Sequence, residues 1–512
     1  MLWIFDTFGK VKKMNQFLCL IFVVVATTAL GIGTAREVPN SRVNVLLLGA
    51  SGNLAEKYLW QGFYNIHTTG LRTGDEIHVY PAATKNFEKA NPILQRILVN
   101  NITTTDEEHK KQFLANNVSP YTQLRSDEQY KALGEKIKKD TIASGKRDAG
   151  LLVYMSVPPK FFGSISQYIN DYLRPSSPDA WLRVIVEKPF GVNLMSAKDL
   201  AETLYKNLDV KEILLVDHYM GKQGLDAIRQ LRKANPEFDK AFLNKNEVSK
   251  VEVAMLETED CKGRTGFYDE VGVIRDTMQN HLMMMVALLG MDLEHADKTE
   301  ADARRAVFDK LQTAAINDIL HLAQYEDYNN HVNEDRAKWD EPLLDEPSKT
   351  PSYASIALKL ENNIWEGVPF IFRSGKALDS RRAYTKVTFK NGGQLLFNLQ
   401  GTTDGIDGSA IHCSLTLCAS KLNLPEAWDH VDNSAEHFHA VGPKIPNAYE
   451  VLLRSALEGD VNNFVRLPEV IESWRVWSPL LRDLPKLELS TYKHGADLIP
   501  KDKLVESKHD EL

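Results

Sequence analysis

The stretch Val43-Asn44-Val45-Leu46-Leu47-Leu48, followed by Gly49-Ala50-Ser51-Gly52-Asn53-Leu54-Ala55, decides the fold of this chain. Its first part is an apolar run interrupted only by Asn44, which is typical of a buried strand in a parallel sheet. Its second part places two glycines where the chain must turn, and a helical pattern continues to Ile66. A strand, a tight turn and a helix in this order predict the opening of a Rossmann-like, doubly wound domain.

Further apolar strands are expected at 77–82, 151–157 and 184–186, separated by helical stretches such as 161–172. Strands that alternate with helices indicate a parallel sheet. We therefore predict a Rossmann-like α/β domain that spans residues 42–210.

The remainder of the chain has a different pattern. Residues 248–257 alternate between apolar and polar with a period of two, as a half-buried antiparallel strand does, and a helix is expected at 271–289. More strands are expected at 354–361, 368–373, 385–390, 394–400 and 411–417. These features predict a second, larger α+β domain over residues 211–490, built on a mostly antiparallel sheet.

Size and charge limit the classes of function. The chain has 512 residues, of which 43% are hydrophobic and 25% charged, so it is globular and long enough for two domains. Its 61 basic and 69 acidic residues give a formal net charge of -8, which argues against nucleic acid as a partner.

The two ends of the chain carry targeting signals. Lysines, an apolar run from Phe17 to about Gly33 and small residues before Arg36 are typical of a secretory signal peptide, which we assign to residues 1–35. An uncleaved anchor is the alternative, because the run is near the lower limit for crossing a bilayer, but cleavage is favoured and would leave no stable membrane span. Residues 491–512 form a polar tail that ends in His-Asp-Glu-Leu, the signal bound by the retrieval receptor of the endoplasmic reticulum. The predicted location is the lumen of that compartment.

The cysteines and the sequons complete this picture. Of four cysteines one lies in the leader, so a disulfide framework is not expected. Asn101 and Asn117 each begin a glycan acceptor sequence, and Pro120 after the second disfavours its use.

The glycine turn is a candidate dinucleotide site. Its candidate cofactor-binding residues are Gly49, Ala50, Ser51, Gly52, Asn53 and Leu54, because glycines let the backbone approach a pyrophosphate at a helix N-terminus. A glycine turn used only for steric reasons is the plainer alternative. The second strand is followed by Lys85 and by no acid that would bind a free ribose, which favours NADP.

Lys188 is a second candidate in cofactor and substrate binding. It lies in Glu187-Lys188-Pro189-Phe190-Gly191, directly after a buried strand, where ligands bind in open parallel sheets. A surface lysine before a proline turn is the alternative.

Two polar clusters beside apolar stretches indicate chemistry on an anion. His218, Tyr219 and Lys222 offer two possible cations and a hydroxyl to a dianion. His281 is the candidate base, because the unperturbed pKa of histidine suits proton abstraction near neutrality. If residues 271–289 form one continuous helix, Asp276 points about 140° away from His281. Asp217 is therefore the better candidate to orient the imidazole of His281.

Four motifs resemble the glucose-6-phosphate dehydrogenase family. They are the glycine turn, Glu-Lys-Pro-Phe-Gly at 187–191, Asp-His-Tyr-Met-Gly-Lys at 217–222 and Ile-Arg-Asp-Thr-Met-Gln-Asn-His at 274–281, and two of them differ from the family pattern by one residue. The resemblance extends over about 43–484. The leader, the retrieval signal and the variants at 57–62 and 221–223 are similar to the endoplasmic reticulum branch, the hexose-6-phosphate dehydrogenases.

The resemblance implies an NADP-dependent oxidation of glucose 6-phosphate or another hexose 6-phosphate to a lactone, the first oxidative step of the pentose phosphate pathway. It implies His281 as the base, Asp217 as its partner, and His218, Tyr219 and Lys222 as phosphate ligands. It further implies substrate-binding roles for Lys188, Glu257, Asp276, Lys376 and Arg381. A homodimer is implied as well, and no metal.

The chain also departs from the family pattern. Asn53 replaces an aspartate of the turn, and the arginine that cytosolic relatives carry after the second strand is missing, so NAD is a possible second cofactor. Members of the branch often carry a C-terminal lactonase domain, and we expect that second activity to be absent.

Two other functions remain open at this point. One is a two-domain dehydrogenase that uses Lys188 on an unphosphorylated sugar or inositol, and the other is a non-catalytic luminal protein that binds a sugar phosphate.

Overall fold

The computed structural model describes residues 41–293, 299–414, 422–425, 428–433 and 438–499. The predicted leader at 1–35 and the retrieval signal lie outside the described residues. The chain divides into a unit of residues 1–40 and a second unit that begins at Ser41, and only the second is described below. Within the described ranges, no helix has the length and apolar character needed to cross a membrane.

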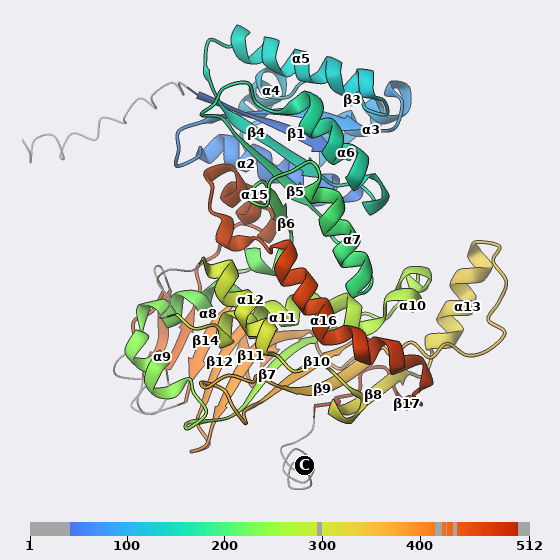
Figure 1. The fold of residues 1–512 in the computed structure, drawn as a ribbon, viewed down its shortest axis with the longest axis vertical. Helices are drawn as coiled ribbons and strands as arrows, with labels where there is room; N and C mark the ends of the chain where they lie inside the picture. Colours follow the sequence, from blue (N-terminus) through green and yellow to red (C-terminus); the bar gives the residue numbers. More distant parts are fainter. Residues whose placement is uncertain (1–40, 294–298, 415–421, 426–427, 434–437, 500–512) are drawn as a thin grey trace, which may run out of the picture. The chain divides into compact units, whose positions relative to one another are not determined.

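The first sheet is parallel throughout, with six strands in the order β3-β2-β1-β4-β5-β6. Every residue of β1 is buried, because this central strand has neighbours on both sides and helices around it (Figure 1). The predicted Rossmann-like sheet is thereby confirmed. The strands are β1 Ser41–Leu48, β2 Glu76–Ala83, β3 Thr122–Gln123, β4 Arg147–Met155, β5 Trp181–Val186 and β6 Ile213–Leu215.

Helices connect these strands, as parallel pairing requires. They are η1 Ala55–Leu59, α2 Trp60–Thr69, α3 Phe87–Asn100, α4 Glu107–Asn116, α5 Asp127–Ala143, η2 Pro159–Phe161, α6 Phe162–Tyr168, η3 Ile169–Leu173 and α7 Leu194–Tyr205. The sheet extends past residue 210, where the sequence placed the end of the first domain, because the short apolar strand β6 pairs with β5.

The second sheet is larger and mostly antiparallel, as predicted. Its described strands follow the order β15-β16-β14-β12-β11-β7-β10-β9-β8-β17, with β13 paired to β12. Only the pairs β10–β7 and β17–β8 are parallel. The strands are β7 Val248–Leu256, β8 Ile319–Tyr325, β9 Tyr353–Lys359, β10 Pro369–Gly375, β11 Arg382–Phe389, β12 Gln394–Thr403, β13 Ile406–Asp407, β14 Ala410–Cys413, β15 Asp429–Asn433, β16 Phe438–Val441 and β17 Ser490–Tyr492.

Helices of the second region pack on one face of this sheet and against the first region. The π-helical segment η5 contacts β7 and β10, while α16 contacts η5, α12 and α7 (Figure 1). The helices are η4 His218–Gly221, α8 Gln223–Ala234, α9 Pro236–Phe242, α10 Thr265–Val273, η5 Ile274–Leu282, α11 Met283–Gly290, α12 Glu300–Lys310, η6 Ile316–Asp318, α13 Tyr328–Lys338, α15 Ala448–Glu458, η7 Val461–Asn463, α16 Leu467–Asp483 and η8 Leu484–Lys486.

The stretch expected to be a helix at 271–289 is helical from Val273 to Gly290, but it is not one regular α-helix. The backbone breaks at Gly272, which has φ +65°, and nine residues of η5 then follow with π-helical geometry before α11 begins. The spacing of apolar residues does not distinguish a π-helical segment between two α-helices from one continuous α-helix, because the flanking α-helical turns keep their pattern.

The two glycan acceptor sequences and the cysteines can also be compared with the structure. Asn117 is buried and its Nδ2 donates to the Ile77 carbonyl at 3.0 Å, so the folded chain does not offer this nitrogen to a glycan. Asn101 is half-buried after α3. Cys413 is disulfide-bonded, and this one bond is not the disulfide framework that the low cysteine count argues against.

Candidate active site

The glycine turn brings three strands of the parallel sheet together. Gly49 has φ +84°, and a Cβ there would lie 2.1 Å from the Ser156 carbonyl oxygen, so only glycine fits. The Gly49 amide donates to the Ala82 carbonyl at 2.8 Å, which ties the end of β1 to the end of β2. The helix that follows begins at this point and directs its free amides towards the turn.

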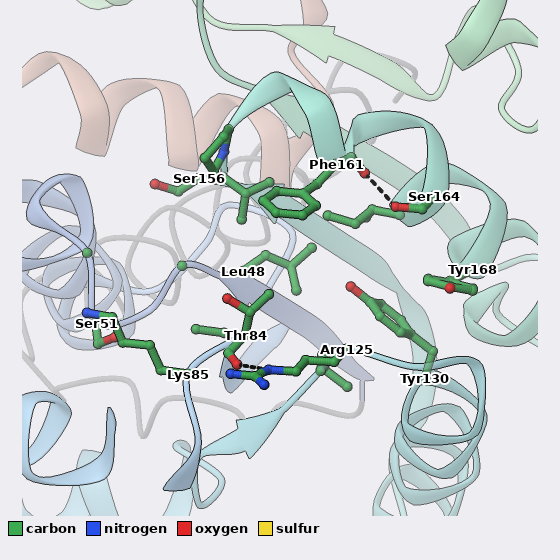
Figure 2. Close-up of a pocket in the computed structure, with 17 residues that line it drawn as sticks. Leu48, Ser51, Thr84, Lys85, Arg125, Tyr130, Ser156, Phe161, Ser164 and Tyr168 are labelled. Carbon is green, nitrogen blue, oxygen red and sulfur yellow. Dashed lines mark hydrogen bonds between the residues drawn. The ribbon is translucent and has the colours of Figure 1, made fainter. Parts of the chain in front are cut away.

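A cavity of about 510 Å³ opens at this turn (Figure 2). Of the predicted cofactor residues, its lining includes Gly49, Ser51, Gly52 and Lys85. Ala50 is buried beneath it, and its carbonyl accepts from Trp60 Nε1, while Asn53 and Leu54 are outside the lining. The lining contains no aspartate or glutamate, and the cavity therefore suits an anionic ligand such as a dinucleotide.

Arg125 is a cavity residue that the sequence did not single out. It precedes α5 and reaches the cavity because β3 pairs with β2, and its Nε donates to the Thr84 carbonyl. The signal that could have identified it is topological, since Arg125 lies after the third strand and far from Lys85 in sequence.

The second site centres on a buried carboxylate and imidazole. Asp217 follows β6 and His281 lies on η5, and Asp217 Oδ1 is 2.5 Å from His281 Nδ1. The same oxygen accepts from the Tyr219 amide at 2.9 Å, which fixes the carboxylate. The sequence-based choice of Asp217 as the partner of His281 agrees with this geometry.

Lys188, which follows β5, lies on the other side of the imidazole. Its Nζ is 3.1 Å from His281 Nε2. Since an ammonium only donates, both contacts are satisfied when His281 Nδ1 carries the proton and Nε2 is the acceptor. This tautomer leaves Nε2 as the basic nitrogen.

Burial and charge set the protonation states of this pair. Burial lowers the pKa of His281 below its ordinary value, and Asp217 opposes the shift only in part. Burial alone would raise the pKa of Asp217, but His281 and Lys188 reverse the effect and hold that pKa well below its usual range. The resting pair is therefore a neutral imidazole beside an ionised carboxylate.

The expected angle between Asp276 and His281 does not apply, because it was derived for a regular α-helix and η5 is π-helical. The charge of Asp276 acts to raise the pKa of His281. Asp276 also lines the same cavity as Lys188 and Asp217, so it belongs to the cluster around His281.

The predicted phosphate ligands are grouped beside the imidazole. The ring of Tyr219 stacks on that of His281 with centroids 4.4 Å apart, and Lys222 Nζ lies 4.1 Å from the centre of the Tyr219 ring. His218 packs edge-on against His281 at 4.7 Å and stacks on Tyr449 at 6.0 Å. Tyr449 of α15 is a contact that sequence reasoning missed.

Of the two possible cations in this group, Lys222 is charged near neutrality and His218 is not. Burial and the nearby His281 lower the pKa of His218 to about 3, so it is a neutral donor rather than the predicted cation. Burial and Arg381 lower the pKa of Lys222 to about 8, which leaves it charged at pH 7. Lys222 Nζ donates to Gln400 Oε1 at 2.6 Å.

The remaining predicted substrate residues lie beside three strands of the second sheet: Glu257 follows β7, Lys376 follows β10 and Arg381 precedes β11. Lys376 Nζ donates to Glu257 and lies 3.1 Å from Asp276 Oδ2, so Asp276 is already paired rather than free. Arg381 is about half exposed and lies 3.7 Å from Glu259.

A cavity of about 580 Å³ contains part of this cluster. Lys188, Asp217, His218 and Asp276 line it, together with Tyr449. His281, Tyr219, Lys222, Glu257, Lys376 and Arg381 are outside its lining and join the cluster through the contacts given above.

Glu187 is a further residue of this cavity that sequence reasoning did not assign. It accepts from the buried Tyr154 hydroxyl at 2.5 Å, and burial raises the pKa of Glu187 to about 7. Its position next to Lys188 was the available signal.

Asp217, His218 and His281 also place ligand atoms within 4.8 Å of one another, a spacing that a metal ion could bridge. The Lys188 ammonium at 3.1 Å from His281 Nε2 opposes a cation there. The group is therefore better suited to proton transfer.

Comparison with known proteins identifies the family. Family models described as "Glucose-6-phosphate dehydrogenase, NAD binding domain" and "Glucose-6-phosphate dehydrogenase, C-terminal domain" match residues 46–226 and 229–509. The "GDH/6PGL endoplasmic bifunctional protein" of Homo sapiens is 33% identical over 93% of this chain, which spans 64% of that protein's length. "Glucose-6-phosphate 1-dehydrogenase 6, cytoplasmic" of Arabidopsis thaliana is 30% identical, with 89% of this chain and 88% of that protein aligned.

Among solved structures, "Glucose-6-phosphate dehydrogenase in complex with its substrate glucose-6-phosphate" superposes with a TM-score of 0.74 and 26% identity, over 92% of this chain and 97% of that one. The two family models together cover both halves of the fold. The chain belongs to the glucose-6-phosphate dehydrogenase family.

Proposed function

We propose that this chain is an NADP-dependent hexose-6-phosphate 1-dehydrogenase that oxidises glucose 6-phosphate in the lumen of the endoplasmic reticulum. The observation that carries the proposal is the buried Asp217–His281 pair, 2.5 Å apart, with Lys188 on its basic nitrogen and Tyr219 stacked on its ring. A base and an anion-binding group in direct contact suit a substrate with a hydroxyl at one end and a phosphate at the other.

In the proposed reaction, His281 Nε2 takes the proton of the anomeric hydroxyl as that carbon becomes the lactone carbonyl. Bound NADP would supply the acceptor for the hydride that leaves the same carbon. Asp217 holds the imidazole in the required tautomer and stabilises the imidazolium that forms. Lys188, which contacts Nε2 in the free protein, is placed to donate to the sugar oxygen that replaces this contact.

The proposed phosphate site combines one cation and two neutral donors. Lys222 supplies the charge, while the Tyr219 hydroxyl remains protonated because burial raises its pKa above the ordinary value. His218 donates as a neutral imidazole, and Arg381 adds charge from a more exposed position. A site of this kind favours a phosphorylated sugar over the unphosphorylated alternatives.

The sugar itself is proposed to bind the acidic and basic groups beside the pair. Asp276 and Glu257 are acceptors for sugar hydroxyls, and Lys376 holds the two carboxylates in place through its contacts with both. Burial of these charges is offset by their pairing, so the site is preorganised before the substrate arrives.

The cofactor, location and partners follow from the same proposal. NADP is the favoured dinucleotide and NAD a possible second one. The signal peptide, the retrieval signal with its receptor, and a glycan at Asn101 are consistent with the endoplasmic reticulum, which the names of the human and rabbit relatives also indicate. A homodimer is proposed on the family resemblance.

One assay tests the proposal. Glucose 6-phosphate, galactose 6-phosphate and glucose are each incubated with the purified chain and NADP or NAD, and the near-ultraviolet absorbance of the reduced cofactor is recorded. We expect NADP to be reduced with both kinds of sugar or with the sugar phosphates alone, and the KM for a hexose 6-phosphate to be far lower than the KM for glucose. Equal KM values for glucose and glucose 6-phosphate, or no reduction with any hexose phosphate, would overturn it.

A further inference from the structure

Two cations in the dinucleotide cavity have no ionic partner in the part of the chain that the structure describes. Lys85 follows β2 and Arg125 precedes α5, and both are exposed. Among the described residues, no carboxylate forms an ion pair with either side chain. Figure 2 shows Lys85, Thr84 and Arg125 along one side of the cavity, with Ser156 and Phe161 on the opposite side. Charges left unpaired in a cavity of this size are available to an anion.

The backbone around Arg125 is held in place independently of any ligand. The Leu124 amide donates to the Ala83 carbonyl at 3.0 Å, and the Tyr121 hydroxyl donates to the Lys85 carbonyl at 2.5 Å. The Arg125 amide donates to Gln129 Oε1 at 2.7 Å, within the capping box that begins α5. These bonds fix the loop after β3 against the loop after β2.

The side chain of Arg125 is oriented by a single bond. Its Nε donates to the Thr84 carbonyl, which aligns the guanidinium beside the end of β2. In the described part of the chain, neither Nη atom has a hydrogen-bond or ion-pair partner. A guanidinium with two free Nη groups is suited to bidentate binding of a phosphate, whereas Lys85 offers only a point charge.

The position of this fork matches one end of a bound dinucleotide. In Rossmann-like domains the pyrophosphate binds at the glycine turn, and the adenosine ribose reaches the residues that follow the second strand. Thr84 and Lys85 follow that strand here, and the cavity lining contains no acid that could bind a ribose 2′-hydroxyl. The group beside Thr84 is instead Arg125, supplied by the next strand–helix connection.

We propose that Arg125, assisted by Lys85, binds the 2′-phosphate of NADP and determines the preference of this chain for NADP over NAD. The inference rests on the proposed function for the identity of the cofactor. The residue that recognises the phosphate then lies in the connection between β3 and α5. The sequence pattern had pointed instead to the residues directly after β2.

Equilibrium binding tests this assignment without turnover. Affinities for NADP, NAD and 2′,5′-ADP are measured by calorimetry for the wild type and for Arg125→Gln, Arg125→Lys and Lys85→Gln. Arg125→Gln should weaken NADP and 2′,5′-ADP by about 10- to 100-fold, as expected for loss of hydrogen bonds to a charged group, and should not weaken NAD. Arg125→Lys should recover part of the loss, and Lys85→Gln should have the smaller effect.

Lys139→Gln is the matched control, because Lys139 lies on α5 and outside the cavity lining. It removes the same charge and should leave all three affinities unchanged. Unchanged affinity for 2′,5′-ADP in Arg125→Gln would overturn the inference, even if the wild type oxidises glucose 6-phosphate with NADP. If the wild type binds NADP through Arg125 but oxidises no hexose phosphate, the proposed function fails and this inference stands.

Discussion

The two proposed anion sites of the molecule differ in how they treat charge. In the catalytic cluster, Asp217 and His281 are buried and paired, and Lys376 is held between two carboxylates. In the dinucleotide cavity, Lys85 and Arg125 are exposed and have no ionic partner among the described residues. Buried charges must be paired to be tolerated, so they are set in advance for one reaction, whereas exposed cations can remain free until a ligand arrives.

This comparison predicts the largest effect for Asp217→Asn. The amide cannot stabilise the imidazolium and does not enforce the tautomer with Nε2 as acceptor, so kcat should fall by about 10²- to 10⁴-fold. Steady-state NADPH formation measures kcat, and calorimetry measures glucose 6-phosphate affinity, which should remain near the wild-type value.

Asp226→Asn on α8 is the control for the charge change, since Asp226 is paired with Arg229 and has no contact with His281. A kcat of Asp217→Asn close to that of this control would remove Asp217 from the role of partner.

A smaller effect is expected in the proposed phosphate site, where the half-buried Lys222 can be compared directly with the exposed Arg381. Lys222→Gln should raise KM for glucose 6-phosphate by about 10- to 100-fold, because it removes a charge-assisted bond in a partly desolvated site. Arg381→Gln should raise it less, because the Arg381 side chain is 51% exposed. Initial rates over a range of glucose 6-phosphate concentrations measure both, and the reverse order of effects would contradict the comparison.

At the glycine turn, a substitution should lower the stability of the fold through backbone strain rather than through loss of charge. Gly49→Ala combines a left-handed φ, which costs about 1–2 kcal/mol, with a Cβ 2.1 Å from the Ser156 carbonyl oxygen. Gly74→Ala has a similar φ of +73° but no atom within 4 Å of its Cβ, so it isolates the conformational term. Urea unfolding should show the greater loss of stability in Gly49→Ala, and equal losses would mean that the close approach to Ser156 is unimportant.

The pH profile should give the smallest effects. The pKa of His281, the proposed base, is lowered by burial, so kcat should persist below pH 6.5, the ordinary pKa of histidine, and fall only at still lower pH. Lys222 loses its proton as the pH rises through its pKa of about 8, so KM for glucose 6-phosphate should increase above that pH, by at most about tenfold per pH unit. KM for glucose should lack this alkaline limb, and so should KM for the sugar phosphate in Lys222→Gln.

Local motifs explain what could be predicted from the sequence. The glycine turn and the Asp217–Lys222 stretch each place several groups within a few residues, so the fold class and the members of the phosphate site follow from adjacency. The Asp217–His281 contact was predictable because each residue adjoins an apolar element that must be buried.

Features that depend on long-range packing were not predictable. The π-helical geometry of η5 changes how Asp276 and His281 are placed around the helix, and the apolar pattern of the sequence does not reveal it. Arg125 reaches the dinucleotide cavity through the pairing of β3 with β2, and the Asn117 sequon is closed by its bond to Ile77. In the last two cases a partner distant in sequence determines the outcome.

The most direct test of the central claim is the turnover of His281→Asn at saturating glucose 6-phosphate and NADP, measured beside its equilibrium affinity for glucose 6-phosphate. If His281 is the base, kcat falls by about 10²- to 10⁴-fold while the sugar phosphate still binds. A folded His281→Asn protein that forms NADPH at the wild-type rate would contradict the account.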